Sequence, residues 1–339
     1  MSLYGSVDLH SNNCYVAVSD EKDALVSHKR IPNNLEEVNL FFRQYQDQMP
    51  EIVVESTFNS YWLVDGLQDL GYQVKLANPG QMHQYTGLKH TDDKSDCLWL
   101  NRMNRLGVLP TGYIYPRKER AVRDLLRRRM LMVRVRTKLI CSLKNQFLTW
   151  KAVDVSRKEV FRLEIQDVET TFEDETLRLS GTSMLEVIQN LSSRIKIIES
   201  YVHKKAKEDG LVERLRILRG IGPILSWVIR YETGDIRRFE SGKHFMSYCG
   251  LVESKKISNF KVKGKNNPKN RNKFLRWAFA EAAIASMAHP PLKNFHDRLV
   301  KKKGKIKAKA ILSSKMARAA FMLMSDPSFH YEERKLFNY

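Results

Sequence analysis

Apolar and polar residues alternate in short runs over the first eighty residues, which is the pattern of half-buried β-strands. Polar turns separate the first three runs, so we expect an antiparallel meander. Two stretches with helical spacing follow, and Asn34 is placed to cap the first of them. This order predicts a mixed sheet flanked by helices. The predicted strands are residues 4–10, 14–18, 24–30, 51–55 and 71–76, and the predicted helices are residues 35–48 and 61–70.

The pattern changes beyond residue 112, where apolar positions recur every three or four residues as in amphipathic helices. A long basic helix is predicted from Pro116 to Trp150 and a second one from Ser183 to Lys207, separated by a polar stretch. We expect these two helices to form an antiparallel hairpin or coiled coil, which serves as a spacer, a dimerisation arm or a nucleic-acid-binding surface. Further helices are predicted at residues 215–229, with a glycine turn inside, and at 272–283 and 307–324.

The chain is therefore predicted to be α/β plus α, with three domains. Residues 1–112 form the α/β domain, residues 113–210 the basic helical region, and residues 211–339 a mainly helical C-terminal domain. A length of 339 residues is sufficient for several such cores.

Charge is distributed very unevenly along the chain. Residues 1–100 contain 7 Lys and Arg against 14 Asp and Glu, whereas the remainder contains 51 against 24, so that the net charge of +20 arises beyond the first domain. A strongly basic region of this kind favours a polyanionic partner, and nucleic acid is the most common one.

No apolar run approaches the ~20 residues of a membrane span. The four cysteines are widely spaced, which indicates a reducing cytoplasm.

Four carboxylates in the first domain are candidates for a metal site. Asp8 and Glu55 lie in or at the end of short apolar strands, where a carboxylate costs free energy unless it is paired or binds a cation. Asp93 and Asp96 begin a predicted helix and share one face of it. Taken singly, each residue is explained as a strand-end or N-capping acid, and Asp92 or Asp93 is a candidate cap. Together they predict a site for two Mg²⁺ ions about 4 Å apart, the arrangement used in phosphoryl transfer, with Mn²⁺ as the substitute.

The most basic stretch, residues 250–265, contains two serines among lysines. A serine hydroxyl surrounded by cations is a candidate nucleophile for a phosphodiester, and the simpler interpretation is a solvated basic loop. Upstream, Gly220 and Gly222 interrupt two helical segments. They are interpreted either as a helix-hairpin-helix turn that binds a DNA phosphate or as a tight turn between helices.

The motifs, in their order, resemble the DEDD-type insertion-sequence transposases that are related to the Piv/MooV DNA invertases. The resemblance rests on strand-borne Asp8 and Glu55, on the segment Lys89 to Asp96, and on the series Gly220 to Pro223, Gly234 to Phe239, Cys249 to Leu251, Ser258 and residues 272–283. It covers nearly the whole chain. Cys97 replaces the usual alanine after the last acid, and Asn259 replaces the usual glycine after the serine.

The resemblance implies an RNase H-like (RuvC-like) N-terminal domain and a bacterial, nucleoid-associated, cytoplasmic recombinase. It implies that Asp8, Glu55, Asp93 and Asp96 bind the metal, and that Ser258 forms a transient covalent link to DNA. The implied partners are donor and target DNA, a structured bridge RNA and further copies of the chain in a dimer or tetramer; no membrane partner is expected. Within this framework, the residues expected to contact nucleic acid are Arg127, Arg128, Arg134, Gly220, Gly222, Lys261, Lys263 and Lys265.

Two alternatives accompany this interpretation. In the first, the chain is a RuvC-like nuclease whose carboxylates activate water, and Ser258 has only a structural role. In the second, the chain binds RNA or DNA without catalysing a reaction, and the acids are structural. The residues alone do not name the target sequence, the RNA or the number of subunits.

Overall fold

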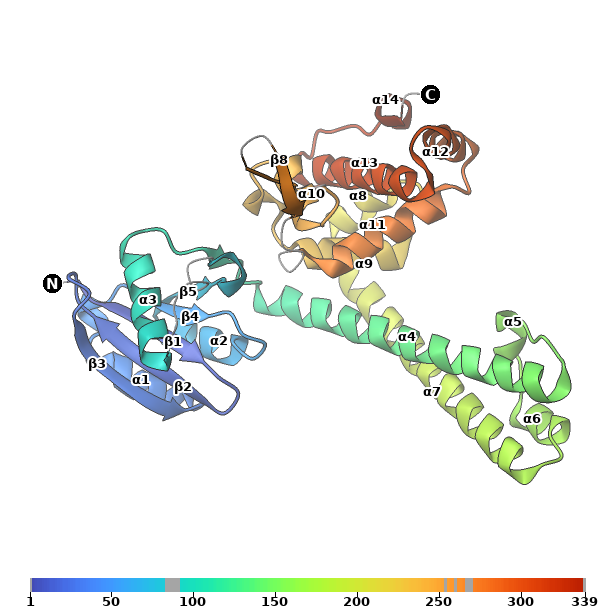
Figure 1. Ribbon diagram of the computed structural model, residues 1–339, viewed down its shortest axis with the longest axis horizontal. Coiled ribbons are helices and arrows are strands. Elements are labelled where there is room, and N and C mark those ends of the chain that lie inside the picture. The colour runs from blue at the N-terminus through green and yellow to red at the C-terminus, as the bar shows by residue number, and fades with distance from the viewer. Residues whose placement is uncertain (1, 83–91, 253–254, 259–260, 266–270, 338–339) are drawn as a thin grey trace. The chain divides into compact units, whose positions relative to one another are not determined.

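The structure is a computed structural model of the 339-residue chain. It describes residues 2–82, 92–252, 255–258, 261–265 and 271–337, and of residues 255–258 and 261–265 it describes the backbone alone. The chain forms two compact units, Met1–Ile114 and Tyr115–Tyr339 (Figure 1). The predicted boundary after residue 112 lies close to this division, and the predicted boundary after residue 210 lies within the second unit.

The first unit is built on a six-stranded mixed sheet with the order β3-β2-β1-β4-β5-β6. The predicted meander is confirmed, since β1 pairs antiparallel with β2 and β2 with β3. β4 lies parallel to β1, β5 is parallel to β4, and the short β6 closes the sheet in the antiparallel direction. The strands are β1 (Tyr4–Leu9), β2 (Asn13–Ser19), β3 (Leu25–Pro32), β4 (Glu51–Glu55), β5 (Gln73–Ala77) and β6 (Thr111–Gly112).

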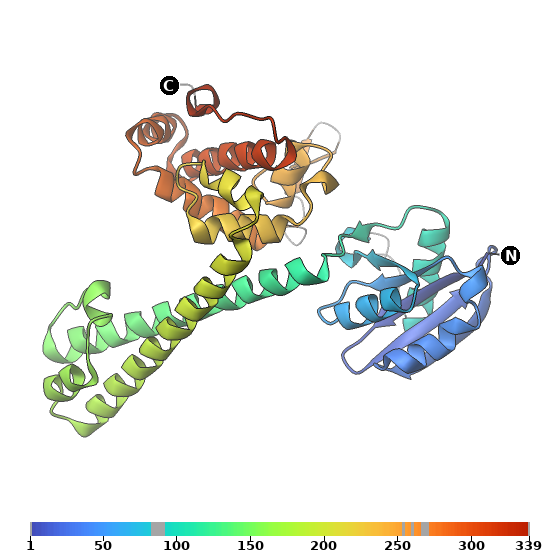
Figure 2. The same cartoon turned by 180° about the vertical axis from the view of Figure 1, so that it is seen from behind.

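Helices cover both faces of this sheet (Figures 1 and 2). α1 (Leu35–Arg43) and α2 (Tyr61–Asp69) lie on one face, and α3 (Asp93–Arg105) packs on β1 and β2 from the other. Val7 and Val54 belong to the core under α1 and α2, whereas Val53 packs with residues of α3. Because side chains alternate along a strand, Asp8 and Glu55 lie on the α3 face. This mixed sheet with its helices fits an RNase H-like domain.

One helix boundary in this unit was predicted wrongly. Asn34 caps α1 as expected, and its side chain accepts hydrogen bonds from the backbone N–H groups of Glu36 and Glu37. The helix ends at Arg43, however, and Gln46–Gln48 form a separate 3₁₀ turn. Leu3 donates its N–H to the carbonyl of Gln48 at 2.9 Å. This segment is therefore hydrogen-bonded to the chain just before β1 and does not continue the helix.

In the second unit, two long helices run side by side in opposite directions and two short ones close their far end (Figures 1 and 2). The helices are α4 (Arg117–Lys151), α5 (Arg157–Val160), α6 (Ile165–Thr171) and α7 (Glu175–Ala206). Buried residues from all four, including Phe147, Val160, Val168 and Leu185, form one apolar cluster. The expected hairpin is therefore present, and its description as a coiled coil stays a prediction.

α7 begins eight residues earlier than predicted, at Glu175. Asp174 caps it, with its side chain accepting from the N–H of Leu177. Gly181 then lets α6 approach closely, because a Cβ at this position would lie 2.7 Å from the Val168 side chain. Packing against α6 thus outweighs the low helix propensity of the serines and threonines in this stretch.

The remaining helices form a bundle around a second apolar core. The predicted helices at residues 272–283 and 307–324 correspond to α11 and α13, and the sequence interpretation missed α12. α12 buries a single residue, Leu292. The elements are α8 (Gly210–Arg216), α9 (Pro223–Thr233), α10 (Gly242–Tyr248), β7 (Lys255–Ser258), β8 (Lys261–Lys265), α11 (Lys273–Ser286), α12 (Pro290–Lys303), α13 (Lys305–Ser325) and α14 (Glu333–Phe337). None of the helices within the described ranges is long and apolar enough to cross a bilayer.

A buried carboxylate joins the long helix to the bundle. Glu232 on α9 is 2% exposed and accepts two hydrogen bonds from the Arg127 guanidinium, at 2.6 and 2.8 Å. The side-chain amide of Asn272, which also caps α11, donates a third at 2.8 Å. The Tyr115 hydroxyl donates to the backbone carbonyl of Glu232 at 2.8 Å. This network connects α4, α9 and the start of α11.

We expect Glu232→Gln to destabilise the second unit by about 2 kcal/mol, because a buried ion pair that loses one charge leaves the other poorly compensated. The figure is below that for a fully buried pair because the Arg127 side chain is 34% exposed. Thermal unfolding followed by circular dichroism should show a midpoint lowered by roughly 5 °C. Glu213→Gln is the matched control, since Glu213 pairs with Arg216 on the surface, where a pair contributes below about 0.5 kcal/mol. Equal shifts in the two variants would contradict this role of Glu232.

Candidate active site

Two parallel strands bring the first two carboxylates together. β1 and β4 pair with Val7 opposite Val54, so that Asp8 and Glu55 are the next residues at the carboxyl ends of neighbouring strands. Asp8 is buried and Glu55 is half-buried. Burial raises the pKa of Glu55 to about 8, aided by a hydrogen bond with Asp8 and by the charges of Asp8 and Asp96. The carboxyl groups of Asp8 and Glu55 therefore repel each other when both are ionised.

Helix α3 supplies the second pair of carboxylates. Asp92 is its N-cap and forms a capping box with Ser95, which accounts for this additional acid locally. Asp93 and Asp96 follow in the first turn. The helix is joined to the sheet because Ser6 on β1 donates to the carbonyl of Cys97 at 2.8 Å. The capping box and this bond fix the direction in which the first turn faces.

Cys97 stands immediately after the second aspartate of α3 and is fully buried. Its thiol lies 3.2 Å from the carbonyl oxygen of Tyr15 on β2. Burial raises the pKa of this thiol far above its ordinary range. The side chain therefore acts as a small packing residue between α3 and the sheet, and the replacement of alanine is accommodated.

Asp96 is aimed at the other acids without a partner of its own. Burial, followed by the charges of Asp8, Asp93 and Asp92, raises the pKa of its carboxyl. Its Oδ1 atom is buried and has no hydrogen-bond partner among the described residues. Because a buried acceptor without a partner costs roughly 1–3 kcal/mol, this atom is placed to bind a group from outside the chain.

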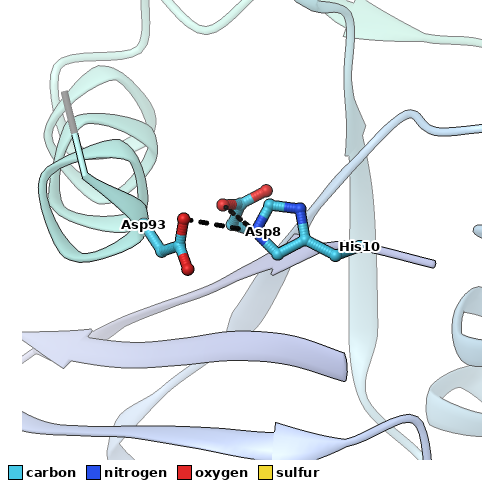
Figure 3. A group of neighbouring side chains, drawn as sticks. All are labelled: Asp8, His10 and Asp93. Carbon is cyan, nitrogen blue, oxygen red and sulfur yellow. Dashed lines mark ion pairs between the residues drawn. The ribbon is translucent and has the colours of Figure 1, made fainter. Parts of the chain in front are cut away.

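A histidine that the sequence interpretation did not single out completes the cluster (Figure 3). The Nε2 atom of His10 lies 3.3 Å from Oδ2 of Asp8 and 3.3 Å from Oδ1 of Asp93. Arg30 on β3 forms an ion pair with the other oxygen of Asp93. Arg30, and then His10, lower the pKa of Asp93. His10 stands two residues after Asp8 at the end of β1, and this spacing is the only signal in the sequence that pointed to it.

The donor set fits a divalent metal ion. Asp8, His10 and Asp93 each direct one ligand atom to a common point, with these atoms within 4.8 Å of one another. Glu55 and Asp96 border the same point through their mutual charge effects with Asp8. Carboxylate oxygens suit Mg²⁺ and Mn²⁺, and a dication would offset the repulsion between the acids and satisfy the free oxygen of Asp96. Of the four predicted acids, Asp8 and Asp93 belong to this group, and Glu55 and Asp96 are close enough for their carboxyl pKa values to respond to it.

The predicted nucleophile, Ser258, is in the second unit. It is the last residue of β7 and pairs with Lys261 on β8 in a two-stranded antiparallel hairpin, with a register shift at Lys256 and Ile257. The stretch is thus a β-hairpin and not an irregular loop. The neighbouring Asn259 lies outside the described residues. Lys261, Lys263 and Lys265 lie on β8, and their roles stay predictions.

The three predicted arginines of α4 differ in their surroundings. Arg127 is bound to Glu232, so its charge is largely used inside the unit. Arg128 and Arg134 are exposed, and neither has an ion-pair partner in the part of the chain that the structure describes. Those two arginines carry the nucleic-acid prediction for this helix.

The two glycines of the turn before α9 also differ. Gly220 has a φ of +94°, and a Cβ there would lie 2.3 Å from the carbonyl oxygen of Ala282. Close packing against α11 therefore requires glycine at position 220. Gly222 is the N-cap of α9, and a Cβ there would meet nothing within 4 Å. Only Gly222 is open to a ligand, and the helix-hairpin-helix role of the turn stays a prediction.

Two family models match the chain and together cover more than half of it. The DEDD transposase model of IS110 elements matches residues 6–150, which include all four acids. The model of the transposase IS116/IS110/IS902 family matches residues 212–297, which include the hairpin with Ser258. The two matches thus fall on the two parts of the chain that carry the candidate site.

Individual relatives agree with these matches. A protein of Pseudomonas aeruginosa named as a family 20 transposase is 24% identical over 256 residues, which is 74% of each chain. The transposase y4qE of Sinorhizobium fredii is 25% identical over 239 residues, which is 68% of this chain and 57% of the relative. The chain thus spans a little over half of the rhizobial protein's length.

Proposed function

Because the chain belongs to the IS110 family of DEDD transposases, we propose that it recombines DNA through a covalent link between Ser258 and a DNA phosphate, with divalent metal ions held by its acidic cluster. The observation that supports this proposal is the group of Asp8, His10 and Asp93 at the end of β1, beside which Glu55 and Asp96 have raised carboxyl pKa values. The same chain carries a basic hairpin with Ser258, which supports the proposal.

The acidic cluster would hold Mg²⁺, with Mn²⁺ as a substitute. Asp8, Glu55, Asp93 and Asp96 would supply oxygen ligands, and His10 would add a nitrogen that Mn²⁺ accepts more readily than Mg²⁺ does. Arg30 holds Asp93 ionised through its ion pair. When bound, the ions supply neutralisation of the negative charge that builds on the phosphate and on its departing oxygen.

In the proposed reaction, the oxygen of Ser258 attacks the phosphorus of a DNA phosphodiester. A bond forms between that oxygen and phosphorus, the bond to one deoxyribose oxygen breaks, and the released deoxyribose hydroxyl gains the proton lost by the serine. A hydroxyl of the exchanged strand then attacks the phosphoserine, and the serine hydroxyl is restored. The number of phosphodiester bonds is conserved, so no external energy source is required.

We extend the proposal to the partners that the family resemblance implies. Donor and target DNA are the substrates, a structured bridge RNA selects them, and the protein acts as a dimer or tetramer in which the acidic cluster of one copy serves the serine of another. The long hairpin of α4 and α7 would act as a coiled coil that binds the RNA and other copies. Exposed Arg128 and Arg134 support that role, as do the open position at Gly222 and the Piv/MooV relationship of the motif order.

A hydrolytic nuclease is the second candidate, and one observation favours it. The acidic cluster is assembled entirely from residues of the first unit, so that the cluster alone has the ligands needed to activate water as RuvC-like nucleases do. Ser258 would then have a structural role.

Incubation of the purified protein with Mg²⁺, the RNA encoded beside its gene and end-labelled donor and target DNA separates the two candidates. Recombination predicts a protein–DNA adduct stable to denaturant, whose phosphopeptide contains Ser258, and joined products without a net gain of DNA ends. Hydrolysis predicts free ends that accumulate without an adduct. The second result would overturn the recombination proposal.

A further inference from the structure

A cationic groove lies in the second unit, whereas the acidic cluster belongs to the first. It encloses about 1020 Å³ between the loop after α10, α11, the end of α12 and the first half of α13. This volume is at the upper limit of small-molecule pockets, which span roughly 300–1,000 Å³. The groove is thus large enough for a segment of a polymer.

Six cations line the groove, and no carboxylate does. Within the described ranges, none of the six has an ion-pair partner, and four of them are exposed. Their mutual repulsion is uncompensated by the protein itself, which indicates an anionic occupant. The six residues are Arg271, Arg276, Lys302, Lys303, Lys307 and Lys309.

The position of the lysines on their helices strengthens this conclusion. Lys307 lies in the first turn of α13, where a positive charge is unfavourable because the N-terminal end of a helix carries partial positive charge. No side chain caps this helix start. Lysines of the last turn of α12 lie on the other side of Gly304. An anion in the groove would offset the unfavourable charge of Lys307 and interact with the uncapped start of α13.

Apolar side chains are exposed among these cations. Ile306, also in the first turn of α13, is 87% exposed, and Val252 on the opposite wall is 45% exposed. Proteins that bind DNA use such side chains beside phosphate-binding lysines to contact or unstack bases. This combination suits a nucleic-acid strand better than an acidic peptide, whose side chains offer few flat apolar surfaces.

The groove leads directly to the hairpin with Ser258. Gly250 has a φ of +67°, and the Arg271 side chain packs over it so closely that a Cβ would lie 2.6 Å from its Cδ. The backbone N–H of Asn272 donates to the carbonyl of Tyr248 at 2.8 Å. These contacts hold the residues just before the hairpin, Tyr248 to Gly250, beside the residues after it, Arg271 and Asn272. From Val252, six residues of extended chain reach Ser258, a span of at most about 20 Å, or roughly six nucleotides of one DNA strand.

We propose that this groove, lined by Arg271, Arg276, Lys302, Lys303, Lys307 and Lys309, binds the backbone of the DNA strand that Ser258 attacks, within about six nucleotides of the reacting phosphate, and that Ile306 contacts the bases of that strand. The choice of DNA as occupant rests on the proposed function, because the hairpin at the groove's edge carries the proposed nucleophile. The groove is then a positioning surface, separate from both the serine and the metal-binding acids.

The test uses full-length protein and fluorescence anisotropy with a labelled DNA that carries the element end, measured between 50 and 300 mM salt. We expect the double variant Lys302→Gln, Lys303→Gln to bind about 10- to 30-fold more weakly at 150 mM salt. We also expect the slope of log affinity against log salt to fall by roughly 1.5–2, because two phosphate contacts are lost. The matched control is Lys301→Gln, Lys305→Gln, which removes the same charge from neighbouring positions outside the groove and should change the slope by less than about 0.5.

Ile306→Ala tests the apolar contact separately. It should weaken DNA binding about 5-fold with an unchanged salt slope, since no ion is released by an apolar contact. Thermal midpoints measured for all variants confirm that each one is folded. Equal slopes in the groove and control variants would overturn the proposal. A groove effect seen with an RNA of the same sequence, and absent with the DNA, would overturn it as well.

These experiments distinguish failure of the groove proposal from failure of the recombination proposal. If the groove proposal alone is wrong, the groove variants bind DNA like the control while the wild-type protein still forms the serine adduct. If the recombination proposal alone is wrong, no serine adduct forms, whereas the groove variants still lose DNA affinity and salt dependence.

Discussion

Asp8→Asn is expected to reduce strand exchange by about 10³-fold or more, because Asp8 contacts His10 and Glu55 and supplies negative charge to the proposed metal site. The Nε2 atom of His10 lies 3.3 Å from a carboxylate oxygen of Asp8. The negative charge of Asp8 contributes to the raised carboxyl pKa values of Glu55 and Asp96. Asparagine keeps the shape of the side chain but removes the charge that attracts a dication. Rates of product formation in Mg²⁺ measure the effect.

The same substitution has an expected effect that does not depend on activity. In the wild-type protein, saturation with Mn²⁺ or Mg²⁺ should raise the thermal midpoint by several degrees, as binding at 100 times the dissociation constant contributes about 2.7 kcal/mol. In Asp8→Asn that increase should disappear. The metal-free variant should be at least as stable as the metal-free wild type, since one repelling charge is gone.

Asp47→Asn provides the control for Asp8→Asn. Asp47 lies exposed in the 3₁₀ turn after α1, on the other side of the unit's core from α3. It should retain both activity and the response to metal. A full metal response in Asp8→Asn would show that the acids are structural, in agreement with the non-enzymatic alternative.

Ser258→Ala should abolish the covalent protein–DNA adduct and reduce recombination by about 10⁴-fold or more, the order of loss expected when a nucleophile is removed. DNA binding should change by less than about 2-fold, because the substitution removes one hydroxyl from a hairpin whose pairing uses backbone groups. The measurements are denaturing gel electrophoresis of the adduct, and anisotropy with the same labelled DNA.

Ser254→Ala is the control, since this serine belongs to the same basic stretch and comes too early to match the family's motif. It should form the adduct at the wild-type level. Retention of recombination by Ser258→Ala would exclude the serine as nucleophile. Unchanged DNA hydrolysis by Ser258→Ala, together with its loss in Asp8→Asn, would instead support the nuclease candidate.

Much of the first unit follows from its sequence. The strand at residues 51–55 was predicted with the bounds that the structure has, and the helix α3 was predicted to begin where it does, at Asp93. The strand follows from a short apolar run, and the helix start follows from the capping acid before it. An error arose where packing overrides local preference, at the early start of α7 under Gly181.

The site divides in the same way. Local chemistry was sufficient to select Asp8, Glu55, Asp93 and Asp96, since carboxylates in apolar strands and paired acids on a helix are unusual. It did not select His10, because one histidine at a strand end has no distinctive pattern. His10 joins the cluster only through the docking of α3 on β1, which places Asp93 beside it (Figure 3).

Arginines and lysines illustrate the same limit in the second unit. The sequence places Arg127, Arg128 and Arg134 alike on a basic helix, whereas the fold binds Arg127 to the buried Glu232, 105 residues away. Likewise, the lysines of α12 and α13 become a groove only when these helices meet Arg271 and Gly250.

The sequence by itself determined the secondary structure of most of the chain, the acidic and basic halves, and the candidate acids and serine. These depend on periodicity, capping and charge, which act over a few residues. The tertiary structure decided that His10 joins the acids, that Asp96 keeps a free buried oxygen, that Gly220 packs inside, and that six cations share one groove beside the Ser258 hairpin. Those properties arise from contacts between residues far apart in the chain, which local patterns do not encode.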